Sequence, residues 1–144
     1  MGLLRIARTP LVTVHPQATV MEAVRTMTQE SIGAIAVTEG NALVGMFSER
    51  DLMRRVVSEK RDPEQIRIRD VMTSPVETIP RDSTADDALK LMLEKHIRHL
   101  PILDRDGSLS GMISMRSLLH DKVEDLTGQL DSLEAYFTAD GFGG

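Results

Sequence analysis

Two stretches of the chain share one pattern: Val-Gly-Met-Phe-Ser-Glu-Arg-Asp at residues 44–51 and Ser-Gly-Met-Ile-Ser-Met-Arg-Ser at residues 110–117. The match continues upstream, where residues 13–37 align with residues 78–102, and one extra residue falls in the turn that follows in the second copy. A long ordered match of this kind indicates an internal repeat. The chain therefore contains two versions of one structural unit.

Each copy has the pattern strand, helix, strand, turn, strand, helix. Thr19 and Thr84 precede apolar helical stripes, and Glu22 and Asp87 follow them at the spacing of a capping box. Short apolar runs on either side of polar, glycine-containing turns predict a hairpin after each helix. Two helices cover only one face of such a sheet, so we expect the two units to bury their other faces against each other.

The sequence therefore predicts an α+β fold, in which two pseudo-symmetric β-α-β-β-α repeats pack sheet to sheet and a C-terminal helix follows. We expect the first repeat at residues 9–57, a polar connector at 58–70, the second repeat at 71–120, and a C-terminal helix with a frayed tail at 121–144. A chain of 144 residues is long enough to bury a core without disulfides or metals.

The composition excludes several classes of protein. The net charge of −5 arises in residues 117–144, so the rest of the chain is neutral and offers no basic surface to duplex DNA. Aromatic residues make up 3% of the chain, too few to stack single-stranded nucleic acid. The lack of cysteine excludes thiolate chemistry and is compatible with a cytoplasmic location. We expect no membrane association, because no apolar run is long enough to span a bilayer.

Apolar residues in the C-terminal segment alternate at spacings of four and three, as in the seam of a coiled coil. These residues are Leu119, Val123, Leu126, Leu130, Leu133 and Phe137. Gly128 weakens such a helix by about 1 kcal/mol relative to alanine. Two interpretations stay open: the helix lies on its own globule, or it pairs with a second chain.

The duplicated motifs resemble a tandem pair of CBS domains, the cystathionine-beta-synthase-type repeat that forms a Bateman module. The resemblance is carried by GMFSERDL at 45–52, IGAIAV at 32–37, HIRHLPI at 96–102 and VMTSPV at 71–76. It implies a stand-alone regulatory module that binds an adenosine-containing nucleotide such as AMP, ADP, ATP or NAD between the repeats. It also implies a homodimer that acts on an unknown partner protein, with no metal and no catalysis.

The Gly-x-x-Ser-x-x-Asp element fits that implied function. Gly45 permits a flat base to approach the strand, and the Asp51 carboxylate can accept hydrogen bonds from both hydroxyls of a ribose. The N–H groups at the helix start favour a nearby anion. Ser48 and Asp51 are equally a plain capping box, which stabilises a helix by about 0.5–2 kcal/mol. The two interpretations do not exclude each other.

By the resemblance, each cleft combines the Ser-x-x-Asp position of one repeat with the leading segment and middle strand of the other. Cleft A is expected to sandwich adenine between apolar side chains, to hold ribose on Asp51 and to meet phosphate with Arg98 and His99. Its full set is Met46, Ser48, Asp51, Met72, Thr73, Ser74, Pro75, Val76, Ile97, Arg98 and His99.

Cleft B is expected to be the weaker site, because it departs from the pattern twice. Ser117 stands where the counterpart of Asp51 belongs, and Gly33-Ala34 replaces Arg98-His99, so the local charge for phosphate is missing. Its full set is Pro10, Leu11, Val12, Thr13, Ile32, Gly33, Ala34, Ser114 and Ser117.

Other functions are less well supported by the sequence. His96 and His99 have no carboxylate cluster beside them, so we predict no metal site. A hydrolytic triad can be composed from Ser48, His99 and Asp51, but nothing resembles a nucleophile elbow, so we predict no enzyme. The main alternative is a structural dimerisation module without a physiological ligand, in which Ser48 and Asp51 only cap their helix.

Overall fold

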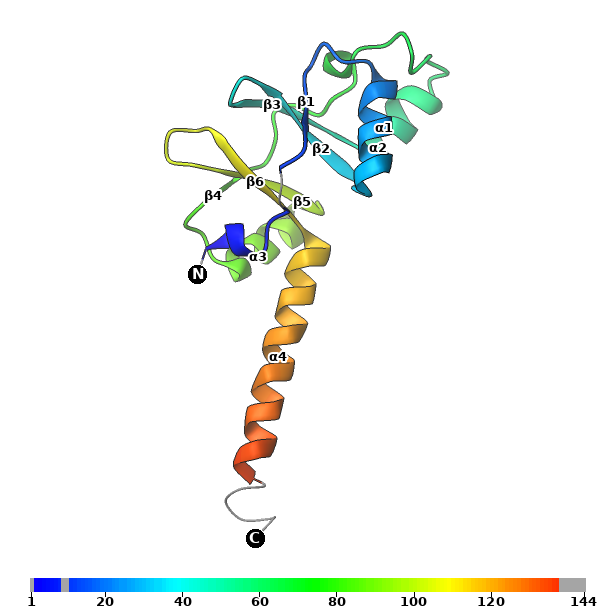
Figure 1. Cartoon of the computed structure of the whole chain (residues 1–144). Helices are drawn as coiled ribbons and strands as arrows, with labels where there is room; N and C mark the ends of the chain where they lie inside the picture. The colour runs from blue at the N-terminus through cyan, green and yellow to red at the C-terminus, as the bar shows by residue number, and fades with distance from the viewer. Residues whose placement is uncertain (1, 9–10, 138–144) are drawn as a thin grey trace.

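The computed structural model describes residues 2–8 and 11–137. The first repeat consists of β1 (Thr13–Val14), α1 (Val20–Glu30), β2 (Ala34–Glu39), β3 (Ala42–Ser48), α2 (Glu49–Asp51) and the π-helix η2 (Leu52–Val57). The second consists of β4 (Ile79–Pro80), α3 (Ala85–Lys95), β5 (His99–Leu103), β6 (Leu109–Ser114) and α4 (Met115–Phe137). The 3₁₀ helices η1 (Leu3–Arg5) and η3 (Ile68–Asp70) lead into the two repeats (Figure 1).

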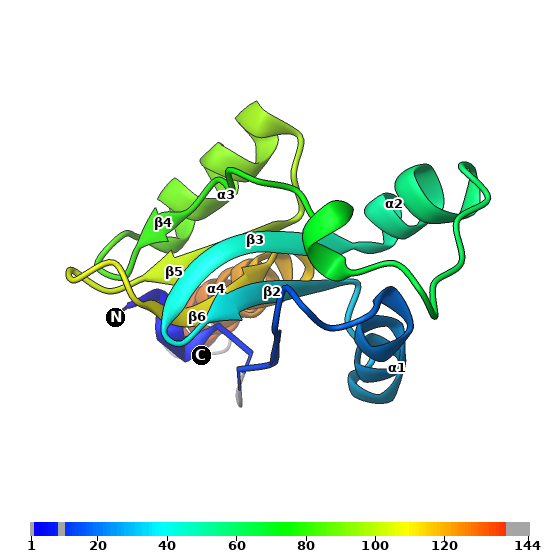
Figure 2. The same cartoon turned by 90° about the horizontal axis from the view of Figure 1, so that it is seen from above.

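The two sheets have the same topology. In each, a short first strand runs parallel to the middle strand, and the middle strand pairs antiparallel with the third, in the orders β1-β2-β3 and β4-β5-β6. Even the register shift recurs, after Val37 in β2 and after Ile102 in β5. The sheets face each other in Figure 2, and their hairpins join where the Leu109 N–H donates to the Asn41 carbonyl at 3.1 Å. The predicted pseudo-symmetric α+β fold is confirmed.

The first helix of each repeat begins and ends in the same way. Thr19 and Thr84 both form complete capping boxes, as their sequence spacing predicts. Ser31 and His96 end the helices in the left-handed conformation, each with φ of 56°. The chain then enters the middle strand, so the caps set where β2 and β5 start. Those starts lie at the clefts.

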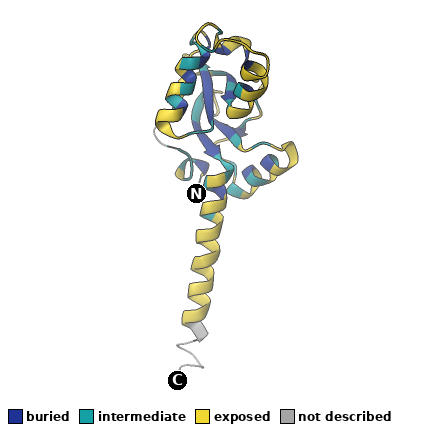
Figure 3. Ribbon diagram, turned by 90° about the vertical axis from the view of Figure 1, so that its right-hand side faces the viewer, coloured by how far each residue is buried: buried dark blue, intermediate teal, exposed yellow. Residues whose placement is uncertain are grey.

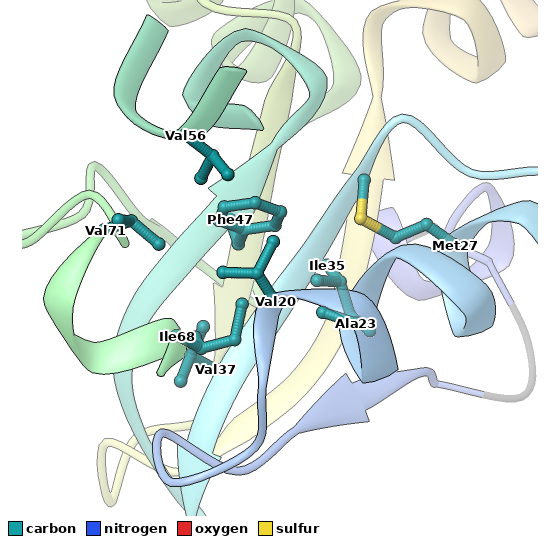
Figure 4. Close-up of a cluster of buried hydrophobic side chains, with 9 residues drawn as sticks. All are labelled: Val20, Ala23, Met27, Ile35, Val37, Phe47, Val56, Ile68 and Val71. Atoms are coloured by element: carbon teal, nitrogen blue, oxygen red, sulfur yellow. The ribbon is translucent and has the colours of Figure 1, made fainter. Parts of the chain in front are cut away.

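Each repeat has its own apolar core, and each core receives a side chain from the segment that leads into the other repeat. Ile68 of η3 is fully buried with Val20 and Phe47 in the first core (Figure 4). Leu3 of η1 is buried in the second core with Ile113. Each leading segment is thus bound across the molecule. This exchange brings residues from both repeats to each cleft.

Helix α4 is both the last helix of the second repeat and an arm beyond it. It is one continuous helix of 23 residues, with no break near residue 120, where the sequence suggests a boundary. It extends away from the two sheets, and its surface is exposed along most of its length (Figures 1 and 3). It does not lie on its own globule. The expected frayed tail at residues 138–144 lies outside the described residues.

Neither α4 nor any other helix within residues 2–8 and 11–137 combines the length and the apolar character needed to cross a bilayer.

Candidate functional site

Asp51 is the buried carboxylate of the first repeat, with 7% of its surface exposed. Its Oδ2 accepts hydrogen bonds from the Ser48 N–H at 3.0 Å and from the Ser48 hydroxyl at 3.2 Å. In return, the Asp51 N–H donates to Ser48 Oγ at 3.2 Å. The pair therefore forms a complete capping box at the start of α2.

The segment that leads into the second repeat is attached to the same carboxylate. The Thr73 hydroxyl donates to Asp51 Oδ1 at 3.0 Å. Thr73 and Met46 exchange backbone hydrogen bonds of 2.8 and 3.0 Å. Five residues expected in cleft A are thus together in the structure: Met46, Ser48, Asp51, Met72 and Thr73.

Arg55 belongs to this cluster although the sequence analysis omits it. Its guanidinium donates to the Met72 carbonyl at 2.8 Å, and its Nε lies 3.7 Å from Asp51 Oδ1. The spacing of four residues from Asp51 on one helix is the signal that identifies such a partner. Arg55 therefore fixes the leading segment beside the capping box.

Gly45 allows close packing by the protein itself in this structure. A Cβ at Gly45 would overlap the Met72 sulfur and lie 3.1 Å from the Thr73 carbonyl oxygen. The Met72 side chain thus occupies the face of β3 where the sequence analysis expects a base. The remaining cleft A residues are exposed (Ser74, Pro75, Arg98) or half-buried (Val76, Ile97).

A cavity of about 300 Å³ lies at the other crossing between the repeats, at cleft B. Seven residues expected there line it: Leu11, Val12, Ile32, Gly33, Ala34, Ser114 and Ser117. Thr13 lies in β1 next to the lining residues. Pro10 falls outside the described residues. Five further residues complete the wall: Arg8, Ser31, His99, Met112 and Arg116.

The expectation that cleft B lacks positive charge is wrong, because Arg8 and Arg116 line its cavity. One guanidinium nitrogen of Arg8 donates to Glu30 at 2.9 Å, but its Nε is buried and has no hydrogen-bond partner among the described residues. An unsatisfied buried donor is costly.

Arg8 could have been found from the repeat. Its backbone N–H donates to the Met112 carbonyl at 3.1 Å, just as Thr73 donates to the matching carbonyl of Met46. Arg8 is therefore the structural counterpart of Thr73. Extending the repeat alignment a few residues upstream places an arginine in cleft B where cleft A has a threonine.

The expected position of His99 is also corrected. The sequence suggests cleft A, but the structure places His99 in the wall of the cleft B cavity. Burial lowers the pKa of His99, the Glu49 carboxylate opposes this effect, and the Arg98 charge adds to it. His99 is therefore neutral near pH 7. It supplies a hydrogen-bonding imidazole without a third positive charge.

Ser114 and Ser117 take the places of Ser48 and Asp51 at the start of α4. The Ser117 N–H donates to Ser114 Oγ at 3.1 Å, and the two hydroxyls are 2.9 Å apart. The cap is thus retained without a carboxylate. Cleft A has the Asp51 carboxylate with Arg55 beside it, whereas cleft B has a neutral cap with Arg8 and Arg116 in its wall.

Among the residues that the structure describes, no group of three or more His, Asp or Glu side chains is close enough to hold a metal ion.

Comparison with known proteins matches both repeats to one family. The family model for the CBS domain matches residues 4–58 and again residues 68–124. An uncharacterised protein of Methanopyrus kandleri is 37% identical over 115 residues, which are 79% of this chain and 59% of that protein. The chain thus spans less than two thirds of the length of that relative.

Solved structures agree with this match. A CBS-domain protein of Burkholderia ambifaria superimposes with a TM-score of 0.79 at 30% identity, covering 87% of this chain and 96% of the other. The protein CBSX2, solved in complex with AMP, superimposes with a TM-score of 0.69 at 25% identity over 82% of this chain and 91% of its own.

Proposed function

This chain belongs to the CBS-domain family and carries the domain twice, and from that premise we propose that it is a regulatory module that binds an adenosine-containing nucleotide between the two copies. AMP, ADP, ATP and NAD are the candidate ligands. The module acts by binding rather than by catalysis. A cytoplasmic location remains a prediction from the composition.

The cavity at cleft B is the observation that supports this proposal most directly. Its volume of about 300 Å³ is at the lower end of the range of small-molecule sites. Leu11, Val12 and Ile32 provide an apolar wall for a base. Arg8 and Arg116 provide guanidinium groups, whose planar forks suit phosphate oxygens.

The start of α4 adds to this preference for an anion. Its first turn carries Arg116 and Ser117, both in the cavity wall, and the helix dipole places partial positive charge there. The Met115 and Ser117 N–H groups already donate to the Arg98 carbonyl and to Ser114 Oγ. We therefore propose cleft B as the primary site.

Cleft A is proposed as the secondary site, which reverses the order expected from the sequence. Both carboxylate oxygens of Asp51 already accept hydrogen bonds from Ser48 and Thr73. The Met72 side chain lies against Gly45. A nucleotide in cleft A would have to displace Met72 and compete with Thr73, and both changes weaken binding.

Calorimetric titration of the full chain with AMP, ADP, ATP and NAD tests the proposal. We expect at least one of these nucleotides to bind, and Arg116→Ala to weaken it about 10-fold, which corresponds to the loss of one charge-assisted hydrogen bond. Arg50→Ala is the matched control, because Arg50 occupies the same position at cleft A and is exposed. Absence of binding below millimolar concentration, or equal loss in both variants, contradicts the proposal.

A purely structural dimerisation module is the second candidate, and the capping box of Asp51 favours it, because the carboxylate is already fully used in stabilising α2. The same titration separates the two functions, since a structural module binds none of the four nucleotides. Both proposed functions include self-association, because the apolar side chains of α4 are exposed to solvent.

A further inference from the structure

The arm of α4 is exposed on all sides after a short anchored start. Leu118 is buried in the second core. Asp121 forms an ion pair with Arg5 at 3.0 Å, and Lys122 forms one with Asp86 at 3.1 Å. From residue 122 to residue 135 every side chain is exposed. Helices of this length without tertiary packing are marginal in water. The arm therefore needs a partner surface to be stable.

An apolar seam runs along this arm. Its members are between 46% and 61% exposed: Leu119, Val123, Leu126, Leu130 and Leu133. In a heptad lettered a to g, Val123 and Leu130 take position a, and the three other leucines take position d. The seam extends over about 21 Å, from the usual rise of a helix.

Gly128 does not interrupt the seam. It takes position f, on the opposite side of the helix, where an added Cβ would meet nothing within 4 Å. Its low helix propensity therefore affects the free helix but not the contact surface.

The charges are arranged as a self-complementary pair requires. The acids Asp121, Glu124, Asp125 and Asp131 occupy positions f, b, c and b, which face water in a coiled coil. In a parallel pair in register, Lys122 would lie beside Thr127 of the second copy, and Gln129 beside its Glu134. No like charges meet along the seam, so a second copy of this chain fits it.

We propose that α4 pairs with α4 of a second copy as a parallel, in-register, two-stranded coiled coil. Val123 at one of the two a positions, with leucine at every d position, favours two strands in this orientation. The proposal deepens the self-association named above and rests on that part alone, because no residue of the seam lines the cavity at cleft B.

The oligomeric state of the full chain tests the pairing. Sedimentation at about 50 µM is expected to give a dimer for the wild type and a monomer for Leu126→Glu. Ser132→Glu is the matched control, because Ser132 lies at the outward position c, and it should remain a dimer. A monomeric wild type, or a Leu126→Glu variant that stays dimeric, overturns the proposal. Nucleotide titration of Leu126→Glu separates this failure from failure of the ligand proposal.

Cross-linking tests the orientation, and the absence of native cysteine makes the result unambiguous. In a parallel pair the two copies of position 133 face each other, so Leu133→Cys should form a disulfide-linked dimer under mild oxidation. Ser132→Cys should not. If Leu133→Cys fails to cross-link while a mixture of Leu119→Cys and Leu133→Cys does, the helices are antiparallel and the proposed geometry is wrong.

Discussion

Asp51 and Ser117 occupy matching positions in the two repeats, yet they differ in charge, and so do the leading residues beside them. Asp51 accepts a hydrogen bond from Thr73 of the leading segment, whereas the matching leading residue at cleft B is Arg8. The loss of one acid is therefore accompanied by the gain of a base. The two changes together convert a site that suits hydroxyl groups into one that suits an anion.

Removal of the Asp51 carboxylate is expected to destabilise the protein. Asp51→Ala leaves the Ser48 N–H and the Thr73 hydroxyl without their acceptor in a partly buried place. We expect a loss of about 2 kcal/mol in the free energy of unfolding, from the lost cap and the unsatisfied donors. Urea denaturation followed by circular dichroism measures this change.

The second repeat of the fold offers a matched control for that experiment. Asp87 makes the same capping box with Thr84 but is exposed, and hydrogen bonds from Thr84 lower the pKa of its carboxyl group. Asp87→Ala should destabilise the protein less than Asp51→Ala. Equal losses of unfolding free energy in the two variants would mean that the burial of Asp51 and its contact with Thr73 do not contribute to stability.

The half-buried imidazole of His99 predicts a pH dependence of stability. Because its pKa is lower in the folded protein than in the unfolded chain, the unfolded chain binds more protons in mildly acidic solution. Its contribution to stability is complete above the unfolded value of 6.5 and is lost as the pH falls through the folded value. Thermal denaturation between about pH 8 and pH 5 should show a shallower decline for His99→Gln than for the wild type.

His96 provides the control, because it is exposed at the end of α3. His96→Gln should retain the decline of the wild type. If His99→Gln and the wild type lose stability in parallel over this range, protonation of His99 does not contribute.

At the scale of elements, the sequence is most informative where local chemistry is sufficient. The threonine caps of α1 and α3 follow directly from the spacing of Thr19 and Thr84, and both are confirmed. The continuity of α4 is not predictable in the same way, because Leu118 is buried in the core while Leu119 belongs to the exposed seam. The apolar periodicity of α4 includes both core residues and seam residues, and only the three-dimensional packing shows which residue belongs to which.

Gly128 gives a prediction for α4 alone. Gly128→Ala should stabilise the helix by about 1 kcal/mol, because alanine has the higher helix propensity and the added methyl group meets no neighbour. Hydrogen exchange of the arm should slow accordingly. Unchanged exchange would contradict this account.

At the scale of the whole molecule, the repeat is sufficient to predict the architecture, because two half-covered sheets have only each other to bury. The crossed arrangement of the clefts is instead what the resemblance to CBS pairs implies; in the structure Thr73 bonds to Asp51, and Val12 and Ser117 line one cavity. Which side chains fill the clefts cannot be predicted from the repeat. Whether Met72 packs on Gly45, and whether Arg8 turns into cleft B, depends on contacts between residues far apart in sequence.

The continuity of α4 has a thermodynamic consequence. Arg116 and Ser117 in its first turn line the cavity, and the seam begins two residues later at Leu119, so one continuous helix contributes to both places. If a tilt of α4 improves the contact with a bound nucleotide, it also alters the contact between two chains along the seam. By linkage, whatever factor a bound nucleotide applies to the association of two chains, association applies to the affinity for that nucleotide. Such a molecule would report the concentration of its ligand as a change in its own assembly.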